Sequence, residues 1–342
     1  MIASPPPHVP QVRVHGPGDV RVDHLTLPPA GPADAVVRVA ACGICGTDLS
    51  YIRLGGLAGP GPEPLCLGHE IAGTVEWVGA DVTRVAVGDR VVVEPGNDTL
   101  GRIGGGAPAG GLTTHLLVRH ADAGMLHHIP HEIALEFAAF AEPLAVGMHA
   151  AEQVEASLDE GVAVFGCGPI GLAAIASLLD KGHRKVVAID LSPTRLRLAE
   201  GLGAQAALDP TRDDVWAELA RLHGTTPFMF GPTPATAAYI EASGSPQVIT
   251  EILNRGRVRG RLAVVALHYR PIEINMLLVM MKEFTIRGSM EYPARFADSI
   301  DLLARRPELE SLITHRFALA HFPDALRVLT ESKDCGKVLI TC

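Results

Sequence analysis

Residues with the chemistry of a metal site gather in one short stretch of the sequence, between Cys42 and Glu70. A thiolate, a hydroxyl, an imidazole and carboxylates are the groups that surround zinc ions with one coordination position left open for catalysis. The stretch therefore predicts a catalytic zinc site, provided that the rest of the chain completes it. Its order is Cys42-Gly-Ile-Cys45-Gly-Thr47-Asp48-Leu-Ser50, a loop rich in glycine and proline, and Gly68-His69-Glu70.

The Cys42-x-x-Cys45 spacing also fits a redox dithiol or half of a structural zinc knuckle. The chain has no second C-x-x-C, however, and we expect that the pair does not open a helix in a thioredoxin-like unit. A catalytic zinc needs only about three protein ligands and a water molecule. The catalytic interpretation is therefore favoured.

A second motif, Gly166-Cys-Gly168-Pro-Ile-Gly171, fits G-x-G-x-x-G. It lies between a predicted strand at 162–165 and a predicted helix at 170–179, which is the context that supports dinucleotide binding. In this motif Gly166 permits a tight turn, Gly168 lets a pyrophosphate approach the backbone, and Gly171 allows the helix to pack on the sheet. The uncharged run 161–179 is long enough to cross a membrane, but its glycine cluster favours strand, turn and buried helix.

Asp190 ends the next predicted strand, nineteen positions after Gly171. A carboxylate there accepts hydrogen bonds from an adenosine ribose and repels a 2′-phosphate, which favours NAD over NADP. The alternative is an ordinary turn residue. The residues that we expect at the cofactor are Gly166, Gly168, Pro169, Ile170, Gly171, Asp190 and Arg195.

The elements around these motifs predict an α/β protein of two domains, as the length of 342 residues suggests. Short strands separated by glycine and proline, at 35–41, 71–78, 89–93 and 112–118, indicate a β-rich, barrel-like first domain. From 145 to 287 strands alternate with helices, the pattern of a doubly wound parallel sheet. We expect a helix over 133–141 that stops before Glu142-Pro143. The predicted division is 1–146 with 288–342, and 147–287.

The composition of the chain argues against some classes of binding partner. The net charge of −9, with 4% aromatic residues, argues against a nucleic-acid surface. Six cysteines form no regular framework, and the start of the chain has no signal-peptide pattern. We therefore expect a cytoplasmic protein, not attached to a membrane, whose partner is a small molecule. The run His127-His128-Ile-Pro-His131 is interpreted as a connector, because neighbouring histidines in a strand point to opposite faces.

Taken together, the motifs resemble those of the medium-chain dehydrogenase/reductase superfamily, specifically its zinc-dependent alcohol and polyol dehydrogenases. The resemblance covers nearly the whole chain and implies a GroES-like catalytic domain and a Rossmann domain. It rests on Cys-Gly-Ile-Cys-Gly-Thr-Asp at 42–48, Gly-His-Glu at 68–70, Gly-Asp-Arg-Val at 88–91, Glu-Pro-Leu at 142–144, and the glycine motif at 166–171.

The resemblance implies a role for each residue of the site. Cys45, His69 and Glu142 fall at the zinc ligands, and Glu70 at a carboxylate that either binds the metal or exchanges with water. Thr47 falls at the hydroxyl that receives the proton of the alcohol, and Asp48 at the group that orients the histidine. Cys42 is not a ligand in the family.

The sequence departs from the family pattern in two places. Many members hold a second, structural zinc with four cysteines after Gly-Asp-Arg-Val, but residues 94–111 contain no cysteine, so we expect one zinc per subunit. That lobe often lies near subunit contacts, and a homodimer or a homotetramer is expected. Ser50 stands where many alcohol dehydrogenases have a relay histidine, so the proton route beyond Thr47 must use Ser50, the ribose or water.

The run Glu-Pro-Leu-Ala-Val-Gly-Met-His at 142–149 is closest to the sorbitol, butanediol and threonine dehydrogenase branch. That similarity favours a secondary alcohol, diol or polyol as substrate, with hydride transfer to NAD. Two alternatives stay open at this point: a zinc-free reductase of the same superfamily, and a non-catalytic nucleotide-binding sensor. Pocket walls are expected from 49–57, 100–114, 268–269 and 290–292.

Overall fold

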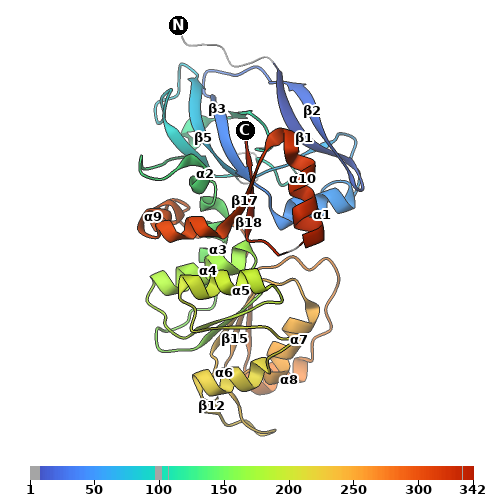
Figure 1. Ribbon diagram of the computed structural model, residues 1–342, viewed down its shortest axis with the longest axis vertical. Helices are drawn as coiled ribbons and strands as arrows, with labels where there is room; N and C mark the ends of the chain where they lie inside the picture. Colours follow the sequence, from blue (N-terminus) through green and yellow to red (C-terminus); the bar gives the residue numbers. More distant parts are fainter. Residues whose placement is uncertain (1–7, 97–101, 107, 333) are drawn as a thin grey trace.

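The computed structural model describes residues 8–96, 102–106, 108–332 and 334–342. The chain forms two lobes, with both chain ends in the upper lobe of Figure 1 and a parallel sheet covered by helices in the lower lobe. Within the described residues, no helix is long and apolar enough to cross a membrane. The run 161–179 is a strand followed by a helix, as the glycine cluster predicts.

The upper lobe is built from strands of two sheets. A three-stranded sheet has the order β2-β1-β4, and a seven-stranded sheet runs β17-β18-β3-β5-β6-β8, with β7 also paired to β3. Alternating apolar side chains along these strands enclose one core, in which Val37, Ile71 and Val91 are fully buried. The strands are β1 (His8–Gly16), β2 (Asp19–Thr26), β3 (Ala35–Gly43), β4 (Leu65–Cys66), β5 (Glu70–Val78), β6 (Arg90–Val93), β7 (His115–Val118), β8 (Leu126–His128), β17 (Ile313–Ala318) and β18 (Lys337–Thr341).

The lower lobe is the predicted doubly wound sheet. All neighbouring strands are parallel in the order β11-β10-β9-β14-β15-β16, so the strand order reverses between β9 and β14, where dinucleotides bind in such folds. The strands are β9 (Val162–Phe165), β10 (Val186–Ile189), β11 (Ala206–Leu208), β14 (Ala238–Glu241), β15 (Arg261–Val264) and β16 (Thr285–Gly288). The α/β fold class is thereby confirmed.

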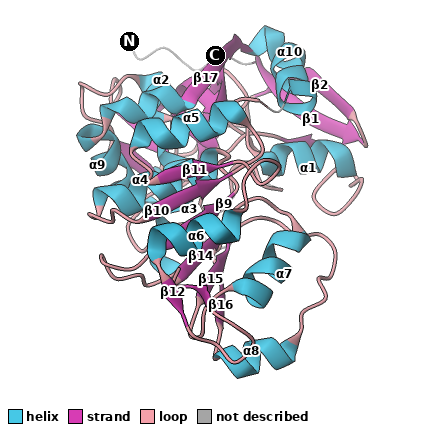
Figure 2. Ribbon diagram, turned by 60° about the horizontal axis from the view of Figure 1, so that its bottom comes forward, coloured by secondary structure: helices cyan, strands magenta, loops and turns pink. Residues whose placement is uncertain are grey.

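Helices cover this sheet, and Figure 2 shows them along its strands. Prolines at the first helical position begin several of them, because that position needs no backbone donor. The helices are α4 (Pro169–Asp180), α5 (Pro193–Leu202), α6 (Val215–His223), α7 (Pro246–Arg255) and α8 (Met276–Lys282), and a short hairpin of β12 (Thr225–Thr226) and β13 (Thr233–Pro234) follows α6.

The chain then returns to the upper lobe. Helix α9 (Ala297–Arg305) packs against α3, and α10 (Phe322–Arg327) lies between β17 and β18 in the sequence. Short 3-10 turns occur at Ala121–Ala123, Pro307–Leu312 and Leu319–His321, and a π turn at Val328–Ser332. Strand β18 pairs with β3, with Ile340 opposite Cys42, and so brings the last residues of the chain to the predicted metal site.

The predicted helix over 133–141 was wrong in its bounds. Helix α2 spans only Leu135–Ala138, and a new helix, α3 (Ala141–Gln153), contains Glu142 and Pro143 in its first turn. The first turn tolerates proline because its backbone N–H groups have no partner inside the helix. Helix α3 packs on α4 and joins the cores of the two lobes. The predicted domain boundary at position 146 lies within this helix.

The cysteine pair does precede a helix, although not one in a thioredoxin-like unit. Helix α1 (Gly46–Leu54) begins directly after Cys45, whose backbone N–H donates to Asp48 Oδ2 at 2.9 Å. This contact satisfies a donor at the helix start and stabilises a helix that its weak helix-forming residues would not predict. The surroundings are antiparallel strands, so the unit is not thioredoxin-like.

Candidate active site

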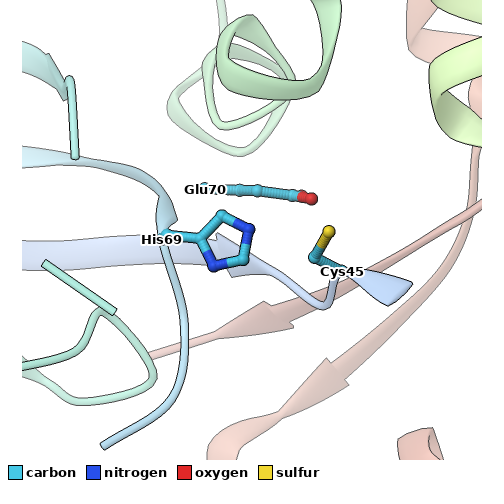
Figure 3. A group of neighbouring side chains, drawn as sticks. All are labelled: Cys45, His69 and Glu70. Carbon is cyan, nitrogen blue, oxygen red and sulfur yellow. The ribbon is translucent and has the colours of Figure 1, made fainter. Parts of the chain in front are cut away.

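Cys45, His69 and Glu70 form a compact group of potential metal ligands. One ligand atom from each lies within 4.8 Å of the others, and Figure 3 shows the thiol, the imidazole and the carboxylate converging on one point. Sulfur, nitrogen and oxygen donors in a set of three suit zinc with an open position. The structure thus brings together the central residues of the predicted site.

Strand pairing brings these three residues together. Cys45 follows the end of β3, and Glu70 begins β5, where it lies opposite Gly43 in the antiparallel register. A Cβ atom on Gly43 would lie 1.8 Å from Glu70 Oε2, so only glycine leaves room for this carboxylate. His69 directly precedes β5 and therefore reaches the same point from the neighbouring strand.

Asp48 ties the two segments to each other. Its side chain is fully buried and accepts hydrogen bonds from the backbone N–H of Cys45 at 2.9 Å and of Gly68 at 3.2 Å. Asp48 Oδ1 is also 3.8 Å from His69 Nδ1. A carboxylate that is hydrogen-bonded to a histidine ligand fixes the orientation of the ring. At 3.8 Å the Asp48 carboxylate lies beside the imidazole, and its hydrogen bonds go to the backbone.

Glu70 has a buried cationic partner. The ammonium group of Lys337, on β18, lies 2.5 Å from Glu70 Oε1 and donates to the carbonyl oxygen of Ile44 at 2.9 Å. Burial by itself lowers the pKa of Lys337, but the charges of Glu70, Cys45 and Glu142, together with the hydrogen bond to Glu70, raise the pKa above its ordinary value. One carboxylate oxygen of Glu70 is thus engaged by the lysine ammonium group.

Glu142, on helix α3, lines the same cleft. It is not part of the compact group of potential metal ligands found among the described residues. Its Oε1 accepts a hydrogen bond of 2.9 Å from the hydroxyl of Tyr292. Burial raises the pKa of Glu142 to about 7, His69 opposes the shift, and Glu70 adds to it. Burial and the charge of Glu142 also raise the pKa of Tyr292, so this phenol stays a donor.

The electrostatics of the site fit a bound cation. Burial alone lowers the pKa of His69, but the charges of Asp48 and Cys45 outweigh it and raise the pKa well above its ordinary value. Among the described residues, His69 Nδ1 and Glu70 Oε2 are buried without a hydrogen-bond partner. Buried polar atoms are almost always satisfied, and negative charge surrounds them. The residues present therefore fit a zinc ion.

The cleft in front of these donors has a volume of about 240 Å³. Thr47 and Tyr51, on one face of α1, line it together with Ile170 at the start of α4. Ser50 is not among the lining residues in the described part of the chain. Of the residues predicted to form the walls, those that line the cleft are 51, 102–105 and 290–292. Leu267 lines the cleft in place of 268–269. Positions 100, 101 and 107 lie outside the described residues.

An ion pair lies at the wall of this cleft. Arg102 Nη2 is 2.9 Å from Glu291 Oε1, and both side chains are about one-third exposed. Glu291 has a φ of 62°, which L residues rarely adopt. The ion pair adds two charged groups to a cleft that is also lined by apolar side chains, among them Val146, Val265 and Leu267.

The glycine motif has the geometry of a phosphate-binding turn. Gly166 has a φ of 91°, and a Cβ on it would meet the backbone of Ala242 at 2.6 Å. A Cβ on Gly171 would lie 1.8 Å from the carbonyl oxygen of Gly166, whereas one on Gly168 would meet nothing within 4 Å. The first and third glycines thus permit close packing, and the second leaves the start of α4 open for an anion.

A cavity of about 650 Å³ continues from this turn. Asp190, at the end of β10, lies in its wall and accepts hydrogen bonds from the backbone N–H of Cys167 at 2.6 Å and of Ser192 at 2.8 Å. Arg195 lines the same cavity, and its Nε donates to the carbonyl oxygen of Cys335 at 2.8 Å. Pro169 is the first residue of α4. The size and lining suit an adenosine moiety.

The three histidines at 127–131 serve structural contacts where the structure describes them. His127 lies 2.7 Å from Glu94 and stacks on Phe296, while His128 contacts the carbonyl oxygen of Arg84. Residues 126–128 are strand β8 and not only a connector. Among the described residues, neither ring belongs to a group of three or more potential metal ligands.

Two contacts at the site were not predicted from the sequence. The hydrogen bond between Tyr292 and Glu142 joins residues 150 positions apart, and the ion pair of Lys337 with Glu70 joins residues 267 apart. A single lysine in the otherwise apolar run Lys337-Val-Leu-Ile was a usable signal, because a buried lysine needs a carboxylate partner. The sequence carried no comparable signal for Tyr292.

Comparison with known proteins agrees with this geometry. Residues 31–131 match the family model of the alcohol dehydrogenase GroES-like domain, and residues 169–305 match that of the zinc-binding dehydrogenases. Human sorbitol dehydrogenase is 30% identical to this chain over 100% of the chain and 98% of that protein. For (R,R)-butanediol dehydrogenase of Bacillus subtilis the identity is 31%, over 96% and 98%.

A solved structure of 2R,3R-butanediol dehydrogenase from Bacillus subtilis superimposes with a TM-score of 0.85 at 28% identity, over 98% of this chain and 99% of that one. The chain belongs to the zinc-binding alcohol dehydrogenase family. It is a zinc- and NAD-dependent dehydrogenase that acts on an alcohol or polyol. The predicted family, fold and class of enzyme are thereby confirmed.

Proposed function

We propose that the chain oxidises secondary alcohols, vicinal diols or polyols, and reduces the matching ketones, with NAD in preference to NADP. The observation that carries this proposal is the group Cys45, His69 and Glu70, two of whose members, Cys45 and His69, line a cleft together with Ile170 of the glycine motif. Metal-binding residues and a nicotinamide would act on one substrate only in such a shared cleft. The names of the sorbitol and butanediol dehydrogenases support a substrate with neighbouring hydroxyl groups.

In this proposal Cys45, His69 and Glu142 hold a single zinc ion, and Glu70 binds it or gives way to water. When bound, zinc supplies Lewis-acid chemistry, which lowers the pKa of an alcohol oxygen. Asp48 orients the ring of His69. The absence of cysteines from 94–111 supports one zinc per subunit.

Thr47 is proposed to accept the proton of the substrate hydroxyl. Its Oγ1 lies 3.6 Å from Cys45 Sγ, so its hydroxyl stands beside the donor group on the cleft side of α1. From Thr47 the proton leaves through Ser50, the cofactor ribose or water. The hydroxyl of Tyr292, 2.9 Å from Glu142, holds that carboxylate in place while the substrate binds.

The preference for NAD rests on Asp190. Its carboxylate is held by two backbone N–H groups at the edge of the cofactor cavity, where it accepts the ribose hydroxyls and repels a 2′-phosphate. A second carboxylate, Asp334, lines the same cavity and accepts from Ser192 Oγ at 2.6 Å. We therefore expect a much lower KM for NAD than for NADP.

A spectrophotometric screen tests the proposal. Purified protein of measured zinc content is assayed with NAD and with NADP against 2,3-butanediol, sorbitol, a secondary alcohol and ethanol. We expect one zinc per chain, turnover with the diol or polyol, and little with ethanol. Two zinc ions per chain, or turnover that survives complete removal of the metal, would refute it. A protein that binds NADH but oxidises no alcohol would instead support the sensor alternative.

We also propose the division into domains at 1–146 with 288–342, and 147–287. Sheet membership supports it, because strands β9, β10, β11, β14, β15 and β16 share one sheet and β17 and β18 join the other. Helix α3 crosses position 146 and serves as the connection. Limited proteolysis of the metal-free protein should cut near 146 or 288; cuts confined to other loops would contradict this division.

A homodimer or homotetramer in the cytoplasm completes the proposal. Strand β16 is an edge strand whose residues are largely exposed, and Met276, Leu277 and Met280 of α8 expose large apolar side chains. Exposed edges and apolar patches mark surfaces that pair with another chain. Light scattering after size-exclusion chromatography measures the mass, and Ile286→Lys should shift it towards the monomer. Cell fractionation tests the location.

A further inference from the structure

A buried acid–imidazole pair lies outside the zinc donors, at the ends of two neighbouring strands. Glu241 is the last residue of β14 and is fully buried. His268 follows β15, and its Nε2–H donates to Glu241 Oε2 at 2.8 Å, with only 11% of the imidazole side chain exposed. The mechanism proposed above uses neither residue, and both come from the parallel sheet that Figure 2 shows.

The two carboxylate oxygens of Glu241 hold two different segments. Oε1 accepts from the backbone N–H groups of Ser243 and Gly244, each at 2.8 Å, and from Ser243 Oγ at 2.6 Å. These three bonds fix the loop that follows β14. Oε2 is engaged by His268, which belongs to the turn after β15. Removing the imidazole therefore leaves the first loop fixed and releases only the second.

The two segments line different cavities. Ala242, Ser243 and Ser245 lie in the wall of the cofactor cavity, whereas Val265 and Leu267 lie in the wall of the zinc cleft. They touch each other, since a Cβ on Gly244 would be 3.9 Å from the carbonyl oxygen of Leu267. In doubly wound sheets the ligand crosses the carboxyl ends of the strands. A dinucleotide that reaches from one cavity into the other must pass this junction.

Apolar packing holds only the first part of the turn after β15, where Val265 packs against the core. Leu267 and Tyr269 are 49% and 52% exposed. The backbone N–H groups of Val265 and Ala266 bond to the carbonyl oxygen of Glu241, but beyond Ala266 the turn depends on the bond of His268 and on Arg53 stacked on Tyr269 at 5.9 Å. A buried, charge-assisted hydrogen bond is the stronger of these two restraints.

We propose that His268 is a positioning residue for the nicotinamide end of the cofactor: its bond to Glu241 fixes the Val265–Leu267 wall against which that ring lies beside the zinc donors. This inference rests on the proposed function, because it assumes that the nicotinamide reaches the zinc cleft. His268 acts through the backbone of its turn and touches no reacting atom.

The test compares the binding of a ligand that carries the nicotinamide with that of a ligand that lacks it. NADH and ADP-ribose, which lacks the nicotinamide, are titrated by calorimetry into wild type, His268→Leu, His268→Gln and Glu241→Gln. We expect His268→Leu to raise the Kd of NADH about tenfold, the effect of one strong hydrogen bond, and that of ADP-ribose less than about twofold. His268→Gln keeps an N–H donor and should recover most of the affinity. Glu241→Gln should weaken both ligands, because it loosens both loops.

His131→Leu, at an exposed histidine outside both cavities, is the matched control and should leave both Kd values unchanged. Equal losses of NADH and ADP-ribose in His268→Leu, or no loss of either, would overturn the role of His268. Should His268→Leu not fold, His268→Ala, which also lacks the donor, takes its place in the same comparison, and His268→Gln remains the rescue variant. If wild type binds NADH yet oxidises no alcohol, the proposed function fails while the NADH comparison still decides the role of His268.

Discussion

Lys337 and Glu70 form a fully buried ion pair, with Lys337 Nζ 2.5 Å from Glu70 Oε1. The pair joins β18 to Glu70, which is the first residue of β5 and one of the potential metal ligands. A second contact, from Lys337 Nζ to the carbonyl oxygen of Ile44, ties the lysine to the segment that leads into Cys45. The metal site and the closure of the β-rich lobe are thus coupled.

Lys337→Met should destabilise the metal-free protein by about 3–5 kcal/mol, because it leaves a buried carboxylate without its counter-charge. Glu70→Gln combined with Lys337→Met should recover part of that loss, since neither charge then remains. Denaturant unfolding of Lys337→Met, Glu70→Gln, the double variant and wild type measures both effects. Additive losses in the double variant would mean that the two side chains do not interact.

Cys45→Ala should abolish bound zinc and turnover together, because it removes the thiolate from the donor group. Cys42→Ala is the matched control: Cys42 is fully buried, and its thiol lies 3.6 Å from the carbonyl oxygen of Gly43. It should cost about 1–2 kcal/mol of stability from the small cavity that it leaves. It should retain one zinc. Metal analysis by mass spectrometry measures the zinc content of both variants. If Cys45→Ala retained zinc and Cys42→Ala lost it, Cys42 would be the zinc ligand and Cys45 would not.

Much of the fold and the centre of the site could be predicted from the sequence. The strands β9 and β14, the cap of α5 by Ser192, and the glycine turn all depend on residues that are neighbours in the chain. Local patterns of this kind are set by backbone conformation and burial, and a single sequence displays them. The donors Cys45, His69 and Glu70 also lie within one short stretch, so their grouping needed only one strand pairing.

The rest could not be predicted, for identifiable physical reasons. Helix α1 begins with Gly46, Thr47 and Asp48, which have weak helix propensity, and is stabilised by the contact of Asp48 with the backbone of Cys45. The start of α3 contradicted a rule about proline that does not hold in the first helical turn. Contacts such as Glu241 with His268 depend on which strands are neighbours, and the sequence alone does not fix the pairing of β14 with β15.

Asp190→Asn should shift the cofactor preference towards NADP. The amide keeps the size of the side chain but loses the charge that repels a 2′-phosphate, and Arg195 in the same cavity can then pair with that phosphate. We expect kcat/KM for NAD to fall about tenfold and the ratio of NAD to NADP efficiency to fall further. Steady-state kinetics with both cofactors measure the ratio. If the ratio of NAD to NADP efficiency stayed the same while kcat fell with both cofactors, Asp190 would only hold its loop in place and would not select the cofactor.

Lys282→Met should lower the free energy of unfolding by about 2–4 kcal/mol, because three carbonyl groups, two of them in buried contacts, lose their donor. Lys282 Nζ donates to the carbonyl oxygens of Leu253 at 2.9 Å, Asn254 at 2.6 Å and Gly256 at 2.8 Å, all at the end of α7. Lys181→Met, which removes an exposed pair with Glu152, should cost less than about 1 kcal/mol. Equal losses in the two variants would contradict this.

His223 should make the protein less stable in acid. Burial lowers the pKa of His223 to about 4, and its Nδ1 lies 2.8 Å from Thr236 Oγ1. In the unfolded chain a histidine titrates near its ordinary pKa of about 6.5. Between these values the unfolded state binds a proton that the native state does not, so stability falls as the pH falls from about 6.5 to about 4.

Wild type and His223→Asn, which keeps a hydrogen-bonding group for Thr236, provide the comparison. From pH 7.5 to pH 5 the difference in unfolding free energy should move by about 1–2 kcal/mol in favour of the variant, after allowance for the partial exposure of the ring. Other groups lower stability equally in both proteins and cancel. Denaturant unfolding at the two pH values measures the difference; a difference independent of pH would show that His223 takes up its proton equally in the folded and unfolded states.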